Sequence, residues 1–521
     1  MTRFTPLTCI VLLTTLHGGG VQAQVVYGAH YDVGYNNVSW VRGVADGNGG
    51  LVISARPIGD SVNLFASSIL HTDNLGEVAS LICYNDGGSD LITCMERANN
   101  GDVVTGSLTS GHFDQPEATD IMLRRIKPDG TVAWAKAYAV VGQYHADLYD
   151  IVQTPSGSFI GLGSFSQDGG DAKPLLFGFT GAGEVLWSNG LHTANGSLQS
   201  LSLTLDPAGG VIATGRFADT PNSTKMLVIR ADTTGVINWS HWYGSTGFNE
   251  ASTVLIRPGG GLAILGSLQG ANGAEGAVVR TGPDGMPISM FGWGSHIQNG
   301  HVFNDGSVMV LCGGYDAGTA IARIDTNNTI QWSTLLSATP WGDLVPFVGG
   351  TRFAYISSEM FSDVTVNTFT DQCETCNADP VPFTVVTTTW AADGSPDVYA
   401  LPVNMASTDL FMVPTPVNAN MSPECMLVVG VQQHVKPDMA ALKCAFTPSN
   451  NELSLEGAML SGRSIVVSDM LGRLLFPNVA VVVQPNERSI RTPLPVYLVP
   501  GYYLAKVLPG DAVCVFVVPP Q

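Results

Sequence analysis

Short runs of alternating apolar and polar residues, separated by turn-forming residues, make up most of the chain. Residues 200–205 alternate with a period of two, which is typical of a strand with one buried face. The run ends at Asp206-Pro207-Ala208-Gly209-Gly210, and an apolar run resumes at Val211. This pattern predicts an antiparallel hairpin, because glycine readily adopts the positive φ that such turns require.

A second hairpin follows in the same unit. Residues 226–231 and 236–240 flank the turn residues Asp232-Thr233-Thr234-Gly235, and Trp239 comes four residues after the glycine. One unit is therefore predicted to contain four short strands.

Both turns recur along the chain. Copies of the first turn are spaced by 44 to 56 residues, close to the repeat of about 40–50 residues found in four-stranded propeller blades. They are Gly49-Gly50, Asn100-Gly101, Ser156-Gly157, Gly209-Gly210, Gly260-Gly261, Asp305-Gly306 and Gly349-Gly350. The second turn is assigned to Gly76, Gly130, Gly183, Gly235, Gly285, Asn328 and Gly394, with a tryptophan four residues later at Trp134, Trp187, Trp239 and Trp332.

The repeats predict an all-β fold. A single blade cannot bury both faces of its sheet, whereas blades in a ring bury each face against a neighbour. We therefore expect a seven-bladed β-propeller over residues 24–403. The recurring tryptophans are expected to be core residues between blades, with sugar stacking as the alternative.

The N-terminus has the pattern of a signal peptide. Arg3 precedes an apolar run over residues 7–16, and Val21-Gln22-Ala23 supplies small residues before Gln24. We expect residues 1–23 to be removed on export. No later stretch is long and apolar enough for a span, so no transmembrane segment is expected in the mature chain.

Charge excludes one class of partner and separates two parts of the chain. The formal net charge is −20, and phosphate binding needs basic patches, so we expect no nucleic-acid partner. Residues 448–521 carry five acidic and five basic residues, so the acidic excess lies upstream. Two domains with different surfaces are predicted. The prolyl stretch Val413-Pro414-Thr415-Pro416-Val417 is interpreted as a spacer, within a linker over residues 404–446.

The cysteines permit disulfides in an exported chain. Cys83 and Cys94 bracket a predicted turn, and Cys425 with Cys444 is a second plausible pair. Cys373 and Cys376 lie in a loop that lengthens the spacing between the second turns at Asn328 and Gly394. This CxxC is expected to be a loop-stapling disulfide or an inert pair, with metal or redox use as the alternative.

The last seventy or so residues predict a small, Ig-like β-sandwich over residues 447–521, because short strands alternate with turns there. The order of its motifs resembles the type A C-terminal sorting domain of type IX secretion cargo. The resemblance rests on Val466-Val467-Ser468-Asp469-Met470-Leu471-Gly472-Arg473, on Leu498-Val499-Pro500-Gly501-Tyr502-Tyr503, and on the terminal strand Val515-Phe516-Val517-Val518. The family opens with Pro-Asn-Pro, where this chain has Thr447-Pro448-Ser449-Asn450.

The resemblance implies a sorting signal and a location. Its residues here would be Asp469, Gly472, Arg473, Pro500, Gly501 and Tyr502. The partner would be the outer-membrane secretion machinery, and the product would be released or attached to the outer cell surface. An accessory module without a sorting role is the alternative.

No catalytic motif stands out. The chain has no HExxH, G-x-S-x-G, Walker or EF-hand pattern, so no catalytic residue, metal site or cofactor is assigned; calcium has no specific pattern in its favour. Loop carboxylates could act as a pair on a glycosidic bond, or bind calcium, or solvate the surface. They are Asp114, Glu117, Asp120, Asp168, Asp171 and, beside Asn249, Glu250.

The function these features favour is recognition outside the cell. Loops on a rigid ring would bind a glycan or protein ligand, while the C-terminal domain directs secretion. A secreted carbohydrate-active enzyme and a structural surface component are the alternatives, and fold alone does not decide among them.

Overall fold

The computed structural model divides the chain into two compact units, a larger one over Tyr27–Glu424 and a smaller one made of Met1–Val26 and Cys425–Gln521. The structure describes residues 24–518 except 34–37, 58–66, 86–89, 111, 114–117, 168–169, 221, 245–246, 271–272, 294–295, 315–317, 338–341, 359–362, 374–378, 381–391, 395, 411, 417–419, 430–442, 448–451, 457–463, 470–473, 481–488, 494–500 and 509–511.

The larger unit is all-β, and its described strands pair into seven antiparallel groups of four. The first group is β2 (Val38–Ala45), β3 (Leu51–Pro57), β4 (Ser67–Thr72) and β5 (Val78–Asn85). The second is β6 (Leu91–Arg97), β7 (Val103–Ser110), β8 (Thr119–Ile126) and β9 (Val132–Val140). The third is β10 (His145–Gln153), β11 (Phe159–Ser166), β12 (Lys173–Phe179) and β13 (Val185–Thr193).

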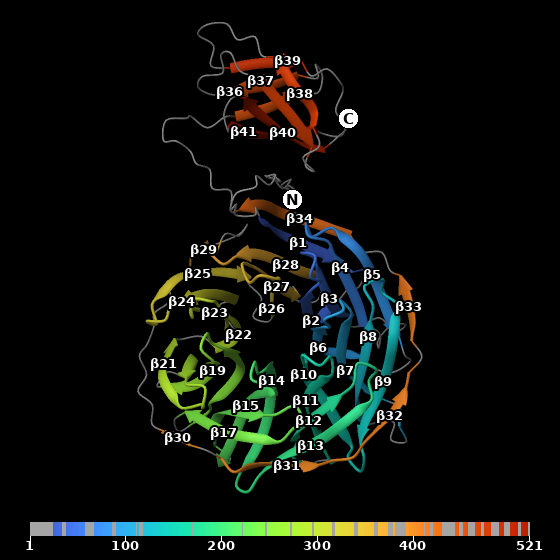
Figure 1. Ribbon diagram of the computed structural model, residues 1–521, viewed down its shortest axis with the longest axis vertical. Helices are drawn as coiled ribbons and strands as arrows, with labels where there is room; N and C mark the ends of the chain where they lie inside the picture. Colours follow the sequence, from blue (N-terminus) through green and yellow to red (C-terminus); the bar gives the residue numbers. More distant parts are fainter. Residues whose placement is uncertain are drawn as a thin grey trace, which may run out of the picture. The chain divides into compact units, whose positions relative to one another are not determined.

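The remaining groups complete a ring around a central opening (Figure 1). The fourth is β14 (Ser197–Leu205), β15 (Val211–Thr220), β16 (Ser223–Ala231) and β17 (Ile237–Gly244). The fifth is β18 (Glu250–Ile256), β19 (Leu262–Gly270), β20 (Gly273–Thr281) and β21 (Pro287–Trp293). The sixth is β22 (His296–Val302), β23 (Val308–Gly314), β24 (Gly318–Ile324) and β25 (Ile330–Ser337). The seventh is β26 (Gly342–Pro346), β27 (Arg352–Ser358), β28 (Val364–Thr370) and β1 (Gln24–Asp32).

The predicted turns explain most of these hairpins. Every first turn has a glycine with positive φ, such as Gly101 at 91° and Gly157 at 86°. Second turns follow the same rule from Gly76 to Gly285, and Asn328 takes the glycine's place with φ of 66°. Asparagine is among the residues that tolerate this conformation best. The backbone N–H of Asp232 donates to the oxygen of Val236 (2.9 Å), which closes one such turn.

The seventh second turn, predicted at Gly394, is wrong. The fourth strand of the seventh group is β1 from the N-terminus, whose Gly28 and Tyr31 pair with Asn367 and Val364 of β28. Gly394 instead lies opposite Trp242 of β17. Joining the two ends of the repeat region in one sheet leaves no open gap in the ring, so the last group needs no second turn.

The recurring tryptophans lie between neighbouring groups, as predicted. Trp134 packs against a buried cluster formed by the second and third groups, and Trp239 packs against one formed by the fourth and fifth. The indole N–H also bonds to the next group: Trp134 donates to the Gly181 oxygen at 2.9 Å, and Trp187 to the Thr233 oxygen at 3.0 Å.

Tyrosine and arginine side chains also bond from one group to the second turn of the next. The sequence interpretation did not predict these bonds. Tyr138 donates to the Gly183 oxygen at 2.7 Å, and Tyr31, Tyr84 and Tyr243 make equivalent bonds to Gly76, Gly130 and Gly285. Arg125 binds Asp102 of its own group and donates to the Gly181 oxygen of the next, at 2.7 Å each. Each bond to a turn carbonyl gives that carbonyl a donor and fixes the spacing of two neighbouring groups.

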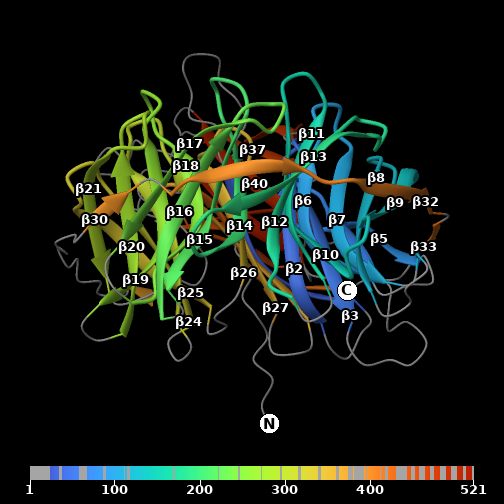
Figure 2. The ribbon, with the colours of Figure 1, turned by 90° about the horizontal axis from the view of Figure 1, so that it is seen from below.

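The described parts of residues 379–416, which we call the belt, run along the outside of the ring (Figures 1 and 2). Its strands are β29 (Asp379–Pro380), β30 (Ala392–Gly394), β31 (Val398–Pro402), β32 (Met405–Asp409) and β33 (Val413–Pro416). They add a fifth strand to β25, β17, β13, β9 and β5, in that order. The belt therefore passes the groups in the reverse of their sequence order.

The belt corrects two predictions. The linker expected at residues 404–446 is wrong over Met405–Pro416, where β32 and β33 pair with the ring, and the strand near residues 398–403 is a belt strand rather than part of a last blade. Proline suggested a spacer because it cannot donate in a ladder. The same property suits an edge strand, which has one side unpaired, and Pro414 and Pro416 lie in such a strand.

The smaller unit contains two antiparallel sheets in its described part. One has the order β35 (Lys443–Thr447), β36 (Glu452–Glu456), β39 (Ser489–Pro493). The other has the order β38 (Leu474–Ala480), β37 (Ser464–Asp469), β40 (Gly501–Leu508), β41 (Ala512–Val518). Before them in the chain, β34 (Asn420–Val429) spans the division between the units.

Candidate functional site

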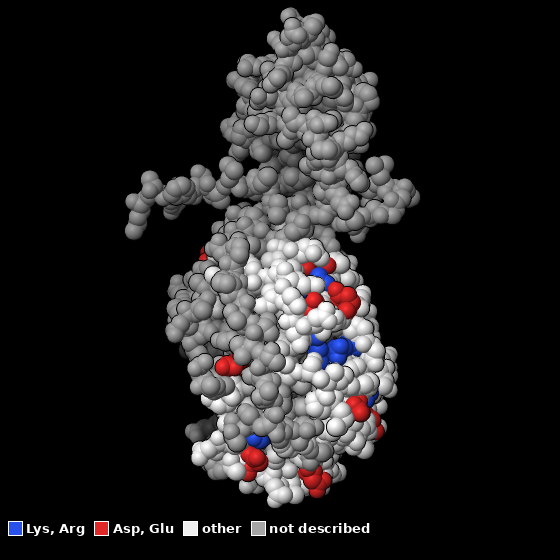
Figure 3. All heavy atoms as spheres, turned by 90° about the vertical axis from the view of Figure 1, so that its left-hand side faces the viewer, with Lys and Arg blue, Asp and Glu red and all other residues white. Residues whose placement is uncertain are grey.

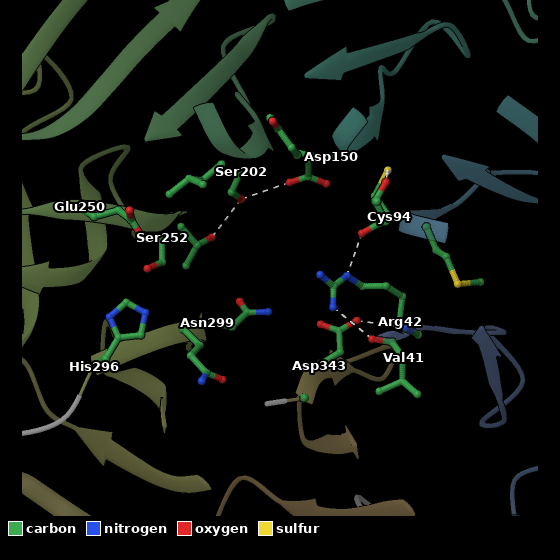
Figure 4. A pocket seen from close by; sticks show the side chains of 18 of the residues that line it. Val41, Arg42, Cys94, Asp150, Ser202, Glu250, Ser252, His296, Asn299 and Asp343 are labelled. Carbon is green, nitrogen blue, oxygen red and sulfur yellow. Dashed lines mark hydrogen bonds between the residues drawn. The ribbon is translucent and has the colours of Figure 1, made fainter. Parts of the chain in front are cut away.

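The first strand of every group lines a cavity of about 770 Å³ at the centre of the ring (Figure 4). Its walls come from β2, β6, β10, β14, β18, β22 and β26, with one residue from β27. The lining residues are Val41, Arg42, Gly43, Thr93, Cys94, Met95, Tyr149, Asp150, Leu201, Ser202, Glu250, Ser252, Thr253, His296, Gln298, Asn299, Gly342, Asp343 and Ser358.

A repeated irregularity turns side chains into this cavity. The register of six of these strands shifts at the same place, for example between Leu148 and Asp150 of β10 and between Ala251 and Thr253 of β18. A bulge adds one unpaired residue and re-aims neighbouring side chains. Tyr149 and Asp150 therefore both reach the cavity, as do Ser252 and Thr253, although strict alternation would point them to opposite sides.

The cavity lies toward one end of the channel. Glu250, His296 and Gly342 line it and are the first residues of β18, β22 and β26. The last residues of the inner strands, next to the first turns, do not line it. We call the end where the inner strands begin the loop face, because the connections between groups lie there.

Two carboxylates of the cavity bind the backbone of a neighbouring group. Asp150 Oδ2 accepts from the Leu203 N–H at 2.7 Å, and its Oδ1 accepts from Ile151 at 2.9 Å. Asp343 Oδ2 accepts from the Gly43 N–H at 3.0 Å and its Oδ1 from Leu344 at 3.0 Å. Burial raises the pKa of Asp150 to about 6, although these hydrogen bonds oppose the shift. The carboxylates of Asp150 and Asp343 therefore hold the inner strands of neighbouring groups together.

Arg42 extends this set of contacts between groups. Its Nε donates to the Thr93 oxygen at 2.8 Å and its Nη1 to the Val41 oxygen at 3.1 Å. The Thr93 hydroxyl in turn donates to the Leu148 oxygen at 2.5 Å. These bonds place the guanidinium of Arg42 and the hydroxyl and carbonyl groups of Thr93 along one wall of the cavity. Figure 4 shows Arg42 on this side.

The opposite wall, from β18 and β22, holds polar groups with fewer protein partners. The Ser252 hydroxyl is buried and has no hydrogen-bond partner among the described residues. Asn299 uses its Oδ1 to accept from the Gly300 N–H at 2.8 Å. Burial lowers the pKa of His296, so its ring is neutral near pH 7. Figure 4 shows these three residues with Glu250 on one side of the cavity.

Of the loop carboxylates chosen from the sequence, only Glu250 lines the cavity. Its neighbour Asn249 is buried and donates to the Thr224 oxygen at 2.6 Å, so it holds the loop. Asp120 is buried on β8, where burial raises its pKa to about 6, and Asp171 is exposed. Asp114, Glu117 and Asp168 lie outside the described residues. Among the three that the structure describes, no two lie together at the cavity.

Most cavity residues were missed, although a simple signal marks them. Counting back seven positions from one glycine of each first turn gives Arg42, Cys94, Asp150, Ser202, Thr253, Asn299 and Asp343. Counting back eight gives Val41, Thr93, Tyr149, Leu201, Ser252, Gln298 and Gly342. Every one of these residues lines the cavity. Aligning the repeats on their turns would have identified both rings.

The disulfide predicted between Cys83 and Cys94 is wrong, because both are free thiols. Cys83 lies on β5, the last strand of its group, and Cys94 lies on β6, the first strand of the next. The two strands do not pair and lie in different sheets. Cys373 is also a free thiol, while Cys376 lies outside the described residues, as do the side chains of Cys425 and Cys444.

The residues of the expected sorting signal fall partly outside the described set. Asp469 ends β37 and is paired with Tyr503 of β40, next to Tyr502 and Gly501 on the same strand. The terminal strand β41 pairs with the other side of β40, so the described parts of all three motif regions lie side by side in one sheet. Gly472, Arg473 and Pro500 are not among the described residues.

Two further features of the described residues bear on partners. Among the described residues, no three His, Cys, Asp or Glu side chains are grouped as metal ligands would be. The same residues include no helix of the length and apolarity that a membrane span requires. Acidic and basic side chains are interspersed on the described surface in Figure 3, which shows no broad basic patch on that face.

Glu96 on β6 is expected to make stability depend on pH. Burial raises its pKa from 4.5 to about 7, with the Asp150 charge adding to the shift. A raised pKa stabilises the fold below pH 4.5, and this contribution is lost as pH rises through 7. Glu96→Gln should therefore reduce the fall in unfolding free energy between pH 5 and 8 by on the order of 2–3 kcal/mol.

Urea unfolding at the two pH values measures this difference. Glu184→Gln, at a side chain that is 65% exposed, is the control and should keep the wild-type fall. If the unfolding free energy of Glu96→Gln falls as much as that of wild type between the two pH values, the raised pKa of Glu96 would be contradicted. Asp150 remains in both variants and accounts for a residual slope, since its pKa is also raised by burial.

Comparison with known proteins gives fold-level likeness only. No family model matches the sequence, and no curated protein matches it. Similar solved structures include the Dos1 propeller, with 11% identity and a TM-score of 0.40 over 66% of this chain and 94% of that one. The Cps50 (Swd1) β-propeller domain of Myceliophteria thermophila has 11% identity and a TM-score of 0.41 over 66% and 99%.

A third similar structure is the GH93 alpha-L-arabinofuranosidase of Fusarium graminearum, seen in complex with arabinobiose. It has 11% identity and a TM-score of 0.41 over 66% of this chain and 98% of that one. At such identities, the ligands and activities of these proteins are not transferred to this chain.

Proposed function

We propose that this chain is an exported recognition protein whose seven-bladed β-propeller binds a glycan in its central cavity, entered from the loop face. The observation that carries the proposal is the cavity itself. Two rings of side chains, at fixed offsets from the turn glycine of each repeat, converge on one space of about 770 Å³. Its size is within the range of about 300–1,000 Å³ typical of small-ligand sites.

The lining supports a hydroxyl-rich ligand. Sugar hydroxyls both donate and accept hydrogen bonds, and the cavity offers Ser252, His296 and Asn299 beside the carboxylate of Glu250 and the guanidinium of Arg42. A protein ligand would need about 800 Å² of contact on each partner. A central cavity with a few polar side chains among apolar ones suits the end of a glycan chain better.

The cavity favours binding over hydrolysis. Glycosidases use two carboxyl groups that act on the same bond. Here both oxygens of Asp150 and of Asp343 already accept backbone N–H groups, and Glu250 faces Arg216 at 3.3 Å. These contacts give the three carboxylates roles in holding the fold, and no described contact pairs two of them across one bond.

The mature full-length chain should be screened on a glycan array, with the same polysaccharides assayed for new reducing ends. The proposal expects binding without cleavage. Cleavage would support the carbohydrate-active enzyme instead. Self-association with no glycan bound would support the structural surface component.

Export belongs to the same proposal. The signal-peptide pattern of residues 1–23 and the resemblance of residues 447–521 to a type IX sorting domain support it, and an Ig-like sandwich is the fold that the resemblance implies. Deleting residues 448–521 in a bacterium with a type IX system should retain the protein in the periplasm. Appearance of the truncated chain outside the cell would exclude the sorting role.

A further inference from the structure

An exposed aromatic ring lies beside the mouth of the cavity. Phe248 is 43% exposed, and Tyr399, at 41%, is the other strongly exposed aromatic side chain among the described residues. Phe248 belongs to the loop between β17 and β18, two residues before Glu250, which lines the cavity. Tyr399 lies on β31 of the belt, on the outside of the ring.

Phe248 is held in place by charged neighbours. The guanidinium carbon of Arg216 lies 5.3 Å from the centre of its ring. Arg216 Nη1 is in turn 3.3 Å from Glu250 Oε2, with side chains that are 32% and 20% exposed. A chain of contacts therefore connects the ring to the cavity wall.

The loop backbone is fixed as well. Asn249, between Phe248 and Glu250, is fully buried. Its backbone N–H donates to the Thr224 hydroxyl at 2.9 Å, and its side chain donates to the Thr224 oxygen. An exposed ring that is already ordered loses little conformational freedom when a ligand covers it.

These groups have the chemistry to bind one sugar ring. Pyranoses present a face of C–H groups, and an aromatic ring gains from covering such apolar surface. The hydroxyls at the edge of the sugar need planar donors and acceptors nearby, which Arg216 and Glu250 supply. Arg216 covers one face of Phe248, so the sugar would use the other.

We propose that Phe248, Arg216 and Glu250 form a sugar-binding subsite at the mouth of the cavity. It stacks one pyranose ring of the glycan while the end of the same glycan enters the cavity. This inference rests on the proposed function and adds to it the residues that contact the ligand at the mouth, of which Glu250 also lines the cavity.

The test compares two exposed aromatic residues in the mature full-length chain. Calorimetry should use the tightest-binding glycan from the array. Phe248→Ala is expected to weaken binding about tenfold or more, the loss of one stacking contact. Phe248→Trp should bind within about threefold of wild type, because indole offers a larger face. Tyr399→Ala, the matched control, should bind like wild type.

The outcomes separate the two proposals. Equal affinity of wild type, Phe248→Ala and Tyr399→Ala would overturn the subsite and leave glycan recognition standing. A wild-type chain that binds no glycan would overturn both. Thermal unfolding of each variant checks the fold; a Phe248→Ala loss with an unchanged melting temperature and normal binding by Phe248→Trp supports the subsite.

Discussion

Asp90→Ala is expected to cost about 3–5 kcal/mol of unfolding free energy, because it leaves the Arg124 guanidinium buried without its carboxylate. Both side chains are fully buried, and Arg124 Nη2 lies 2.7 Å from Asp90 Oδ2. The same Nη2 donates to the Ser67 hydroxyl at 2.8 Å, and Nε donates to Thr105 at 3.1 Å. Ser67 belongs to the first group and the other three residues to the second.

A double-mutant cycle gives this prediction its control. Arg124→Met with Asp90→Ala removes both charges, and should cost less than the sum of the single changes because no unpaired charge remains. Glu184→Ala breaks the more exposed pair with Lys136 and should cost under about 1 kcal/mol. Additive costs in the cycle would contradict a strongly coupled buried pair.

Proline substitutions in the belt should have the second largest effect. The Val141 N–H donates to the Asn404 oxygen and the Leu410 N–H to the Ala135 oxygen, at 2.9 Å each. In an antiparallel ladder, hydrogen-bonded pairs alternate, so Ala406 and Thr408 direct their N–H groups toward β9. Ser407 directs its N–H outward.

The double change Ala406→Pro with Thr408→Pro should therefore lower the unfolding free energy by about 2–4 kcal/mol, since two bonds are lost and two carbonyls of β9 lose their donors. Ser407→Pro is the matched control, expected within about 1 kcal/mol of wild type. Denaturant unfolding of the full chain measures both. Equal destabilisation by inward and outward prolines would show that the belt is not held by this ladder.

The sequence predicted the repeats well because their turns are local. A positive φ at Gly101 or Gly235 is required within a few residues, so composition alone reveals it. Trp134 and Trp239 were correctly placed between groups because they recur at a fixed distance from those turns.

The predictions that were wrong concern segments whose pairing partners lie far away in the sequence. Asp393-Gly394 has the composition of a hairpin turn, yet it pairs with β17, and the missing outer strand comes from the N-terminus. Pro414 and Pro416 fit a spacer as well as an edge strand, and only the position of β5 decides between them. Cys83 and Cys94 are near in sequence but lie in separate sheets.

The candidate site likewise combines features that local sequence predicts with features that depend on long-range packing. The bulges that turn Asp150 and Ser252 toward the channel break the alternation by a single residue, which no isolated strand pattern reveals. Their constant offset from the turn glycine was present in the sequence. Glu250 was identified as a loop carboxylate, but its place at the cavity and its contact with Arg216 follow only from the packing of the fourth and fifth groups.

The most direct test of the account is to fill the cavity. Ser252→Trp in the full chain would place an indole at a position that lines the cavity. Calorimetry with the tightest-binding glycan should show a loss of about 100-fold or more, while Thr234→Trp, on an exposed turn at the other end of the channel, should bind like wild type. Undiminished affinity in a folded Ser252→Trp variant would contradict glycan recognition in the central cavity.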